Sequence, residues 1–224
     1  MEPRNFSAIK VVGFDLDQTL YPKSPLIDEM IQGYLYQKIA AHKNVPLDEA
    51  GRLFKERYRG GTGLSGSQTL RDLGLPNASE LVQEALEHAD IASILTPNEK
   101  TNLFLKDVRA QYEGMDLITG SSLHETEKKL NALGLGPNTF TTVITEDQAM
   151  KSTGDSYRLW LSRYPHFAPQ QFLYIGDRVR SDHEIPSALG IRTVLVYVPQ
   201  PDTAVSALQL PSIADLYPLL LPNT

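Results

Sequence analysis

A short apolar segment that ends in two acids most constrains how this chain can fold. Residues 9–14 are mostly apolar and rich in branched side chains, and Asp15 and Asp17 follow them. Such a run, without alternation of polar and apolar residues, is typical of a parallel strand buried on both faces. In an open α/β sheet the carboxyl ends of the strands border the ligand crevice, so both acids are placed for chemistry.

The two acids are close enough in sequence to act at one site. Side chains two residues apart on a strand point the same way, so the carboxylates of Asp15 and Asp17 can converge. Their repulsion has to be offset by a neighbouring lysine or arginine, by a raised pKa, or by a cation. A hard divalent ion such as Mg²⁺ is the simplest solution. The pair alone is equally consistent with a solvated turn in which Asp17 or Thr19 caps the next segment.

The rest of the chain divides into a helical part and an alternating part. Residues 21–109 carry apolar positions at helical spacing, interrupted by glycine and proline, and offer no strand candidate. Farther on, apolar strands at 115–119, 141–145, 172–175 and 192–197 alternate with helices. This pattern predicts a Rossmann-like α/β fold, a parallel sheet with helices on both faces and an inserted all-helical cap. We expect residues 1–20 and 110–224 to form the core, residues 21–109 the cap, and residues 210–221 a short helix.

The early strands of the expected sheet all end in polar groups. In chain order these are Asp15 and Asp17, then Thr119 with Gly120, then Lys151, and then Asp177 and Asp182. Taken singly, Thr119 could cap a helix and Lys151 could be solvated. Because the carboxyl ends of parallel strands meet at one edge of a sheet, the ordered set predicts one site.

Composition excludes several classes of site. The 224 residues include 21 Lys and Arg against 27 Asp and Glu, a net charge of −6 that gives a nucleic-acid polymer no electrostatic support. The absence of cysteine excludes disulfides, cysteine nucleophiles and thiolate metal sites. Residues 1–5 lack the apolar region of a signal peptide, and no run is long enough for a membrane span. We expect a cytoplasmic monomer or homodimer that binds no membrane.

The ordered strand-end groups resemble the motifs of the haloacid dehalogenase (HAD) superfamily of phosphohydrolases. Those motifs are DxDxT, a strand-end Ser or Thr, a Lys before a helix, and the acidic pair GDxxxxD. They correspond here to residues 15–19, Thr119, Lys151 and residues 176–182. The resemblance covers essentially the whole chain and implies that the insertion is a C1-type cap.

The resemblance implies a phosphomonoester hydrolase that acts through an aspartyl-phosphate. Asp15 would be the nucleophile, and Asp17 would protonate the leaving oxygen and then activate water. Thr119 and Gly120 would donate hydrogen bonds to the phosphoryl oxygens, and Lys151 would neutralise their remaining charge.

The resemblance also implies a Mg²⁺ cofactor. Its ligands would be the Asp15 carboxylate, the Asp17 backbone carbonyl and the Asp177 carboxylate. Asp182 would orient Lys151 or a metal-bound water. Whether Asp177 or Asp182 is the direct ligand stays open at this point.

The substrate is expected to be a small phosphomonoester chosen by the cap. Residues 15–22 and 58–64 look similar to pyrimidine 5′-nucleotidase-like members, which points to a nucleoside monophosphate. A phosphoglycolate or sugar-phosphate phosphatase is the alternative, and a non-catalytic phospho-ligand binding module is the alternative from another class. The glycine-rich residues 59–67 are either a helix-to-helix loop or a substrate contact. Asp17 argues against a dehalogenase, which has no leaving oxygen to protonate.

Two positions depart from the family pattern. Gln18 stands where many phosphatases carry Gly or Asn, and Ser152 follows Lys151 where the family often has Pro. Neither change removes a reactive group, although the backbone after Lys151 is less constrained without the proline.

Overall fold

The chain folds into two compact units, each described here by itself. The computed structural model describes residues 6–58, 64–198 and 202–221. One unit comprises Met1–Lys23 and Leu95–Thr224, and the other comprises Ser24–Ile94. The first unit therefore consists of two segments of the chain, and the second unit is the segment between them in sequence.

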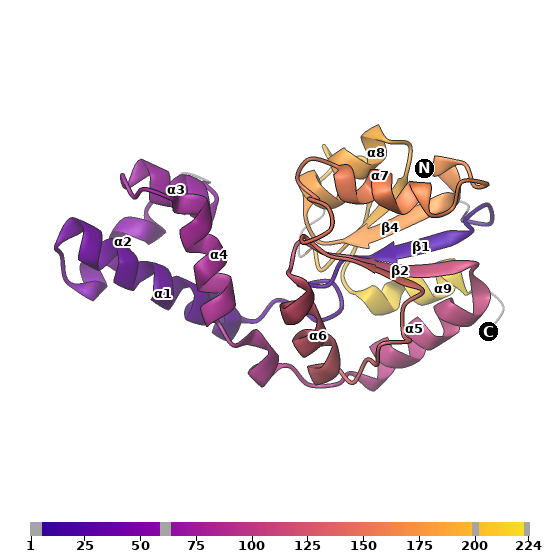
Figure 1. Cartoon of the computed structure of the whole chain (residues 1–224), viewed down its shortest axis with the longest axis horizontal. Coiled ribbons are helices and arrows are strands. Elements are labelled where there is room, and N and C mark those ends of the chain that lie inside the picture. The colour runs from indigo at the N-terminus through magenta and orange to yellow at the C-terminus, as the bar shows by residue number, and fades with distance from the viewer. Residues whose placement is uncertain (1–5, 59–63, 199–201, 222–224) are drawn as a thin grey trace. The chain divides into compact units, whose positions relative to one another are not determined.

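Within the described residues, a six-stranded sheet forms the centre of the first unit (Figure 1). Its strands are β1 (Val11–Phe14), β2 (Gly114–Ile118), β3 (Thr142–Ile144), β4 (Phe172–Gly176), β5 (Arg192–Val196) and β6 (Leu208–Leu210). They lie in the order β3-β2-β1-β4-β5-β6, and every neighbouring pair is parallel. The chain order reverses on either side of β1, which makes its carboxyl end the switch point where such sheets bind ligands. The predicted Rossmann-like α/β fold is confirmed.

Helices cover both faces of this sheet. Helices α5 (Glu99–Gln111) and α9 (Tyr217–Leu220) lie on one face, and α7 (Asp155–Ser162) and α8 (Ile185–Ala188) lie on the other (Figure 1). Helix α6 (Leu123–Ala132) lies beside α5, where the Asn102 side-chain amide donates to the backbone carbonyl of Leu133 at 3.0 Å. Strands β1, β2 and β4 are buried along their whole length, which explains their largely apolar sequences.

Trp160 on α7 anchors one of these layers. The indole is fully buried and packs edge to face on Phe172, with ring centroids 5.0 Å apart. Its Nε1–H donates to the buried carboxylate of Asp116 at 2.7 Å, and the Tyr164 hydroxyl donates to the same group at 2.9 Å. A Cβ at Gly13 would lie 2.6 Å from a Trp160 ring carbon, so β1 can approach this indole only with glycine there.

Helix α5 belongs to the sheet unit, although the sequence predicts a cap over residues 21–109. Phe104 of α5 packs edge to face on Phe14 of β1, with centroids 6.2 Å apart, and Leu105 and Val108 are fully buried. The compact helical unit is therefore shorter, at Ser24–Ile94. Amphipathic spacing identifies a helix and its apolar face, but not the layer that covers this face.

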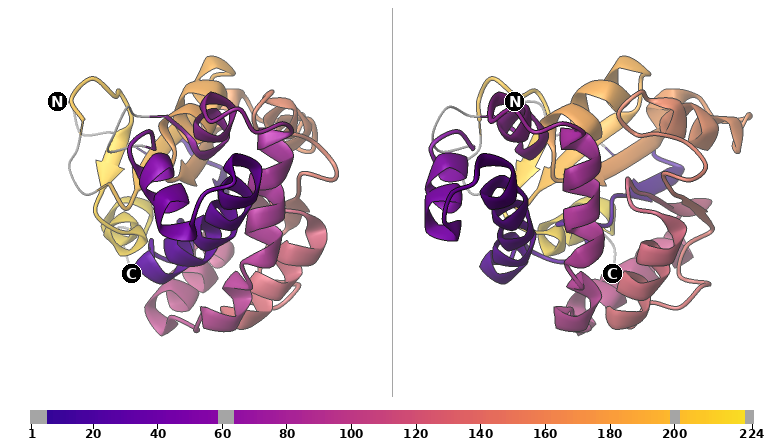
Figure 2. Two further views of the ribbon diagram at one scale, coloured as in Figure 1. Left: turned by 90° about the vertical axis from the view of Figure 1, so that its left-hand side faces the viewer. Right: turned by 60° about the vertical axis from the view of Figure 1, so that its left-hand side comes forward.

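The second unit is a bundle of helices with its own apolar core (Figure 2). The helices are α1 (Pro25–Lys43), α2 (Leu47–Lys55), α3 (Gly66–Asp72) and α4 (Ala78–His88), with a 3₁₀ turn at Ile91–Ile94. Helix α1 packs on α2 and α4, and α3 packs on α4. The core includes the fully buried Ile39 and Leu70. Across the described parts of the chain, no helix combines the length and the apolar character that crossing a bilayer requires.

The glycine-rich segment is only partly described. Residues 59–63 lie outside the described ranges. Beyond them, Ser65 accepts from the backbone N–H of Gln68, whose side chain accepts from the N–H of Ser65. These two residues therefore form the capping box of α3. This gives both of them a structural task.

The C-terminal segment is not the single helix that the sequence predicts. Residues Leu208–Leu210 pair with β5 as a parallel strand, a 3₁₀ turn covers Ile213–Leu216, and α9 begins at Tyr217. Pro218 interrupts the run because proline cannot donate the backbone hydrogen bond that a continuous helix needs. The short strand was missed because its three residues are too few for a periodic signal.

The buried Asp116 predicts a pH-dependent stability. Burial raises the pKa of this carboxyl above its usual range, and the hydrogen bonds from Trp160 and Tyr164 only partly oppose the shift. The folded state therefore binds the proton more tightly than the unfolded state, and the free energy of unfolding falls as pH rises through the raised pKa. Relative to wild type, Asp116→Asn should gain stability as pH rises above about 4, by about 1.4 kcal/mol per unit by which the pKa of Asp116 is raised. Urea unfolding of both proteins at a series of pH values measures this difference in the free energy of unfolding. A difference that stays constant or shrinks as pH rises would contradict the raised pKa of Asp116.

Candidate active site

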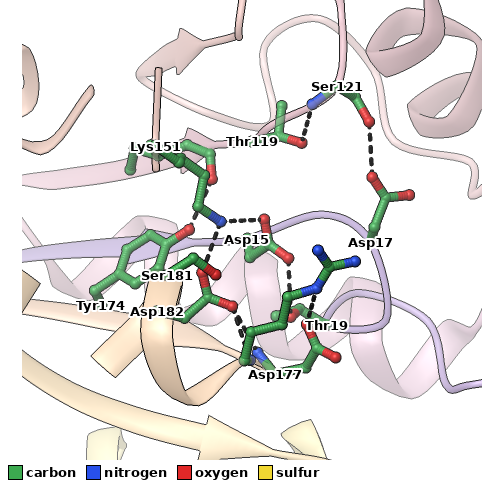
Figure 3. Close-up of polar contacts among 12 residues, drawn as sticks. Asp15, Asp17, Thr19, Thr119, Ser121, Lys151, Tyr174, Asp177, Ser181 and Asp182 are labelled. Atoms are coloured by element: carbon green, nitrogen blue, oxygen red, sulfur yellow. Dashed lines mark hydrogen bonds and ion pairs between the residues drawn. The ribbon is translucent and has the colours of Figure 1, made fainter. Parts of the chain in front are cut away.

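The residues predicted from the strand ends meet at the carboxyl edge of the sheet (Figure 3). Asp15 comes directly after β1, and its backbone N–H donates to the carbonyl of Ile175 on β4 at 2.8 Å. The hydrogen bonds between β1 and β4 therefore extend as far as Asp15. Because the side chain of Asp15 is 8% exposed, this carboxylate needs compensating charge nearby.

Lys151 supplies that charge from the loop after β3. Its Nζ lies 2.6 Å from Oδ1 of Asp15 and 2.8 Å from Oδ1 of Asp182, and 5.2 Å from the centre of the Tyr174 ring (Figure 3). Burial opposes the charge on Lys151, but the two carboxylates outweigh burial and raise the pKa of the ammonium above its usual value. Lys151 is therefore a fixed cation between two buried acids.

Asp182 holds both Lys151 and the loop that follows β4. It lies in a π-helical turn at Val179–Glu184 and is fully buried. Its Oδ2 accepts from the backbone N–H groups of Asp177 at 3.1 Å and Arg178 at 2.9 Å. A Cβ on Gly176 would lie 2.4 Å from the Cβ of Asp182, so this glycine lets the loop fold back on its strand.

Asp177 carries a buried oxygen, Oδ1, whose nearest charged partner is the Nε of Arg178 at 3.8 Å. Its Oδ2 lies 3.6 Å from the Nζ of Lys23, while its Oδ1 is buried and accepts no hydrogen bond from the described residues. Burial raises the pKa of Asp177 to about 6, and burial with the neighbouring acids raises the pKa of Asp15 despite Lys151. Asp15, Asp177 and Asp182 each offer one oxygen, and these oxygens lie within 4.8 Å of one another. A hard divalent cation fits this all-carboxylate donor set and would relieve the repulsion.

The end of β2 presents hydrogen-bond donors. Thr119 is fully buried, and its backbone N–H donates to Ile144 of β3 at 2.9 Å. Its Oγ1 accepts from the backbone N–H of Ser121 at 3.1 Å, which leaves the hydroxyl proton available for another acceptor. Gly120 between them is exposed and has no atom near the position of a Cβ. An anionic oxygen can therefore approach the backbone here.

Asp17 is held by three residues that sequence reasoning missed. Its Oδ1 lies 2.7 Å from the Nζ of Lys129 and accepts from the Tyr21 hydroxyl, and its Oδ2 accepts from the Ser121 hydroxyl at 2.7 Å. Burial acts against the charge on Asp17, but Lys129 and the hydrogen bonds outweigh it and lower the pKa of this carboxyl. These contacts hold the Asp17 side chain in place, and Lys129 favours its charged form.

One signal in the sequence could have identified Lys129. Thr126, Lys129 and Leu130 are the buried residues of α6, at helical spacing. A lysine on the core-facing stripe of an amphipathic helix is unusual unless its charge is paired. The neighbouring Lys128 is exposed, as is usual for lysine.

The chain belongs to the haloacid dehalogenase-like hydrolase family, whose sequence model matches residues 12–196. The prediction of a HAD superfamily enzyme is thereby confirmed. Among curated proteins it is similar to the glyceraldehyde 3-phosphate phosphatase of Methanopyrus kandleri, with 25% identity over 196 residues that cover 84% of each chain. The family and this relative support a phosphatase.

Solved structures share the fold over nearly the whole chain. A HAD phosphatase from Thermococcus onnurineus aligns with a TM-score of 0.65 and 20% identity, covering 95% of this chain and 98% of that one. The L-2-haloacid dehalogenase of Xanthobacter autotrophicus aligns with a TM-score of 0.58 and 17% identity, covering 96% and 100%. At these identities the likeness concerns the fold alone, which phosphatases and dehalogenases have in common.

The backbone of Gln18, beside the site, has a strained conformation whose cost can be measured. Its φ is +60°, a left-handed conformation that costs a residue with a Cβ about 1–2 kcal/mol. We expect Gln18→Gly to raise the free energy of unfolding by about 1 kcal/mol, and the β-branched Gln18→Val to lower it by a similar amount. The control variant is Gln148→Gly. Gln148 has no positive φ, so glycine there should not raise the free energy of unfolding. Equal effects of glycine at the two positions in denaturant unfolding would contradict the strain.

Proposed function

We propose that this protein is a Mg²⁺-dependent phosphomonoesterase that forms an aspartyl-phosphate on Asp15. The observation that carries the proposal is the buried contact of Asp15 with Lys151, at 2.6 Å, in a site that holds three converging carboxylates. A carboxylate can attack phosphorus once the charge of the phosphate is neutralised. A non-catalytic binding module would not need Asp15, Asp17 and Lys151 together.

The proposed ligands of the metal are the Asp15 and Asp177 carboxylates and the Asp17 backbone carbonyl. The buried Oδ1 of Asp177, which accepts no hydrogen bond from the described residues, supports Asp177 as the direct ligand. Asp182 already uses its oxygens on Lys151 and on two backbone N–H groups, which supports a positioning role. When bound, Mg²⁺ would neutralise negative charge on the phosphoryl group and on the acids.

The chain's own residues account for the rest of the scheme. An Asp15 oxygen attacks phosphorus while the bond to the leaving oxygen breaks, and a protonated Asp17 transfers its proton to that oxygen. In the second half, Asp17 takes a proton from water as the water oxygen attacks the same phosphorus, which releases phosphate and restores Asp15. Thr119, Gly120 and Lys151 would bind the phosphoryl oxygens throughout.

The helical unit at Ser24–Ile94 is the proposed C1-type cap, which selects the leaving group. Two substrate classes are in competition. The segments at 15–22 and 58–64 favour a pyrimidine nucleoside monophosphate, whereas the 25% identity with a glyceraldehyde 3-phosphate phosphatase favours a sugar phosphate. Both are alkyl phosphomonoesters, so the chemistry of the core is the same for either one.

Phosphate release over a substrate panel tests the proposal. The panel comprises nucleoside monophosphates, glyceraldehyde 3-phosphate, phosphoglycolate and p-nitrophenyl phosphate, each with Mg²⁺ and with EDTA. We expect release from at least one alkyl ester with Mg²⁺ and its loss in EDTA, because the acid cluster repels the phosphate without the cation. The preferred ester decides between the two substrate classes.

Two variants control the panel. Asp15→Asn should lose at least about 10³-fold in kcat, because an amide is no nucleophile, while its circular dichroism stays that of the folded protein. Asp155→Asn, which changes a carboxylate whose side chain is 61% exposed, should keep full activity. Release that persists in EDTA, or an active Asp15→Asn variant, would refute the scheme.

A further inference from the structure

Lys129 is a buried cation that the scheme above leaves without a role. Its side chain is 5% exposed and projects from α6, and its Nζ lies 2.7 Å from Oδ1 of Asp17 and 3.1 Å from Oγ of Ser121. Burying an ammonium group is costly unless the charge is paired and hydrogen-bonded. Both conditions are met at the carboxylate that is the proposed acid and base.

The backbone alone does not fix Asp17. The hydrogen bonds that join β1 to β4 extend to Asp15, whereas Asp17 lies in the turn that follows, with a side chain 26% exposed. Contacts from two other elements hold this side chain: Ser121 after β2, and Lys129 on α6. They tie the turn after β1 to the neighbouring strand and helix.

Charge makes Lys129 the decisive contact. Asp17 and Asp15 repel each other, and Lys151 pairs with Asp15 and Asp182 instead. Without Lys129, only the hydroxyls of Tyr21 and Ser121 would hold the part-exposed Asp17 carboxylate, and no cation would offset the solvation of its charge by water. Lys129 therefore keeps an additional acid inside a site that already holds three.

Ser121 connects this pair to the expected phosphate contacts. Its hydroxyl donates to Asp17 and accepts from Lys129, while its backbone N–H donates to Thr119 Oγ1. The position of the Asp17 carboxylate is thus coupled to the hydroxyl that would bind the phosphoryl group. A proton donor for a leaving oxygen has to be held in such a fixed relation to the phosphorus.

We propose that Lys129 is a positioning residue that, with Ser121, holds Asp17 where it can protonate the leaving oxygen of an alkyl phosphomonoester. This inference rests on the proposed function. The proton moves from the Asp17 carboxyl to the oxygen of the breaking P–O bond as Asp15 bonds to phosphorus, and Lys129 keeps its own protons. Alkoxides are poor leaving groups that need this proton, whereas p-nitrophenolate leaves without it. The proton on Asp17 therefore matters for the hydrolysis of alkyl esters and much less for that of p-nitrophenyl phosphate.

The test compares Lys129→Met with wild type on two esters, p-nitrophenyl phosphate and the best alkyl phosphomonoester of the panel. The parameter is kcat/KM, because it reports the steps up to the first P–O cleavage. We expect a loss of about 10- to 100-fold for the alkyl ester, within the range that general acid catalysis contributes, and less than about threefold for the aryl ester. Lys128→Met, on the exposed neighbouring lysine, should leave both values unchanged.

Further variants separate positioning from loss of folding. Ser121→Ala removes one hydrogen bond to Asp17 without changing a charge, and it should show the same leaving-group pattern at smaller amplitude. In an Asp17→Asn background, Lys129→Met should have no additional effect, because the residue acts through Asp17. Equal losses on both esters, no loss on the alkyl ester, or additivity with Asp17→Asn would overturn the proposal. A wild type that hydrolyses neither ester would instead refute the proposed function itself.

Discussion

A single buried ammonium group, that of Lys151, is what allows the acids of this site to converge. It lies 2.6 Å from Asp15 and 2.8 Å from Asp182, and all three side chains are nearly or fully buried. Removing Lys151 would leave two buried carboxylates uncompensated, at a cost of about 3–5 kcal/mol. Lys151 therefore stabilises the same arrangement that would bring phosphate and cation to the nucleophile.

The sheet determines which residues can reach this ammonium group. Because β1 lies between β2 and β4, Asp15 is flanked by Thr119 on one side and by the loop after β4 on the other. Gly176 permits that loop to fold back closely enough for Asp182 to bind Lys151. The Oδ1 of Asp177, which accepts no hydrogen bond from the described residues, lies in the same cluster, where a divalent cation would offset the remaining negative charge.

The parts that local sequence determines were predictable, and the parts set by tertiary contact were not. Strand ends and their polar residues follow from short apolar runs, so the meeting of Asp15 and Lys151 could be foreseen. Helix α5 belongs to the sheet unit because Phe104 packs on Phe14. The spacing of apolar residues along the helix could not predict this contact. Lys129 lies far from Asp17 in sequence, and only its place on a buried helix face hinted at a partner.

The most direct test of the central claim is to trap the covalent intermediate. The protein is mixed with p-nitrophenyl phosphate and Mg²⁺, quenched in acid during turnover, digested, and mapped by mass spectrometry. The account predicts a phosphoryl group on the peptide that contains Asp15, and none on that peptide in the Asp15→Asn variant. A phosphoryl group on another residue, or normal turnover by that variant, would contradict it.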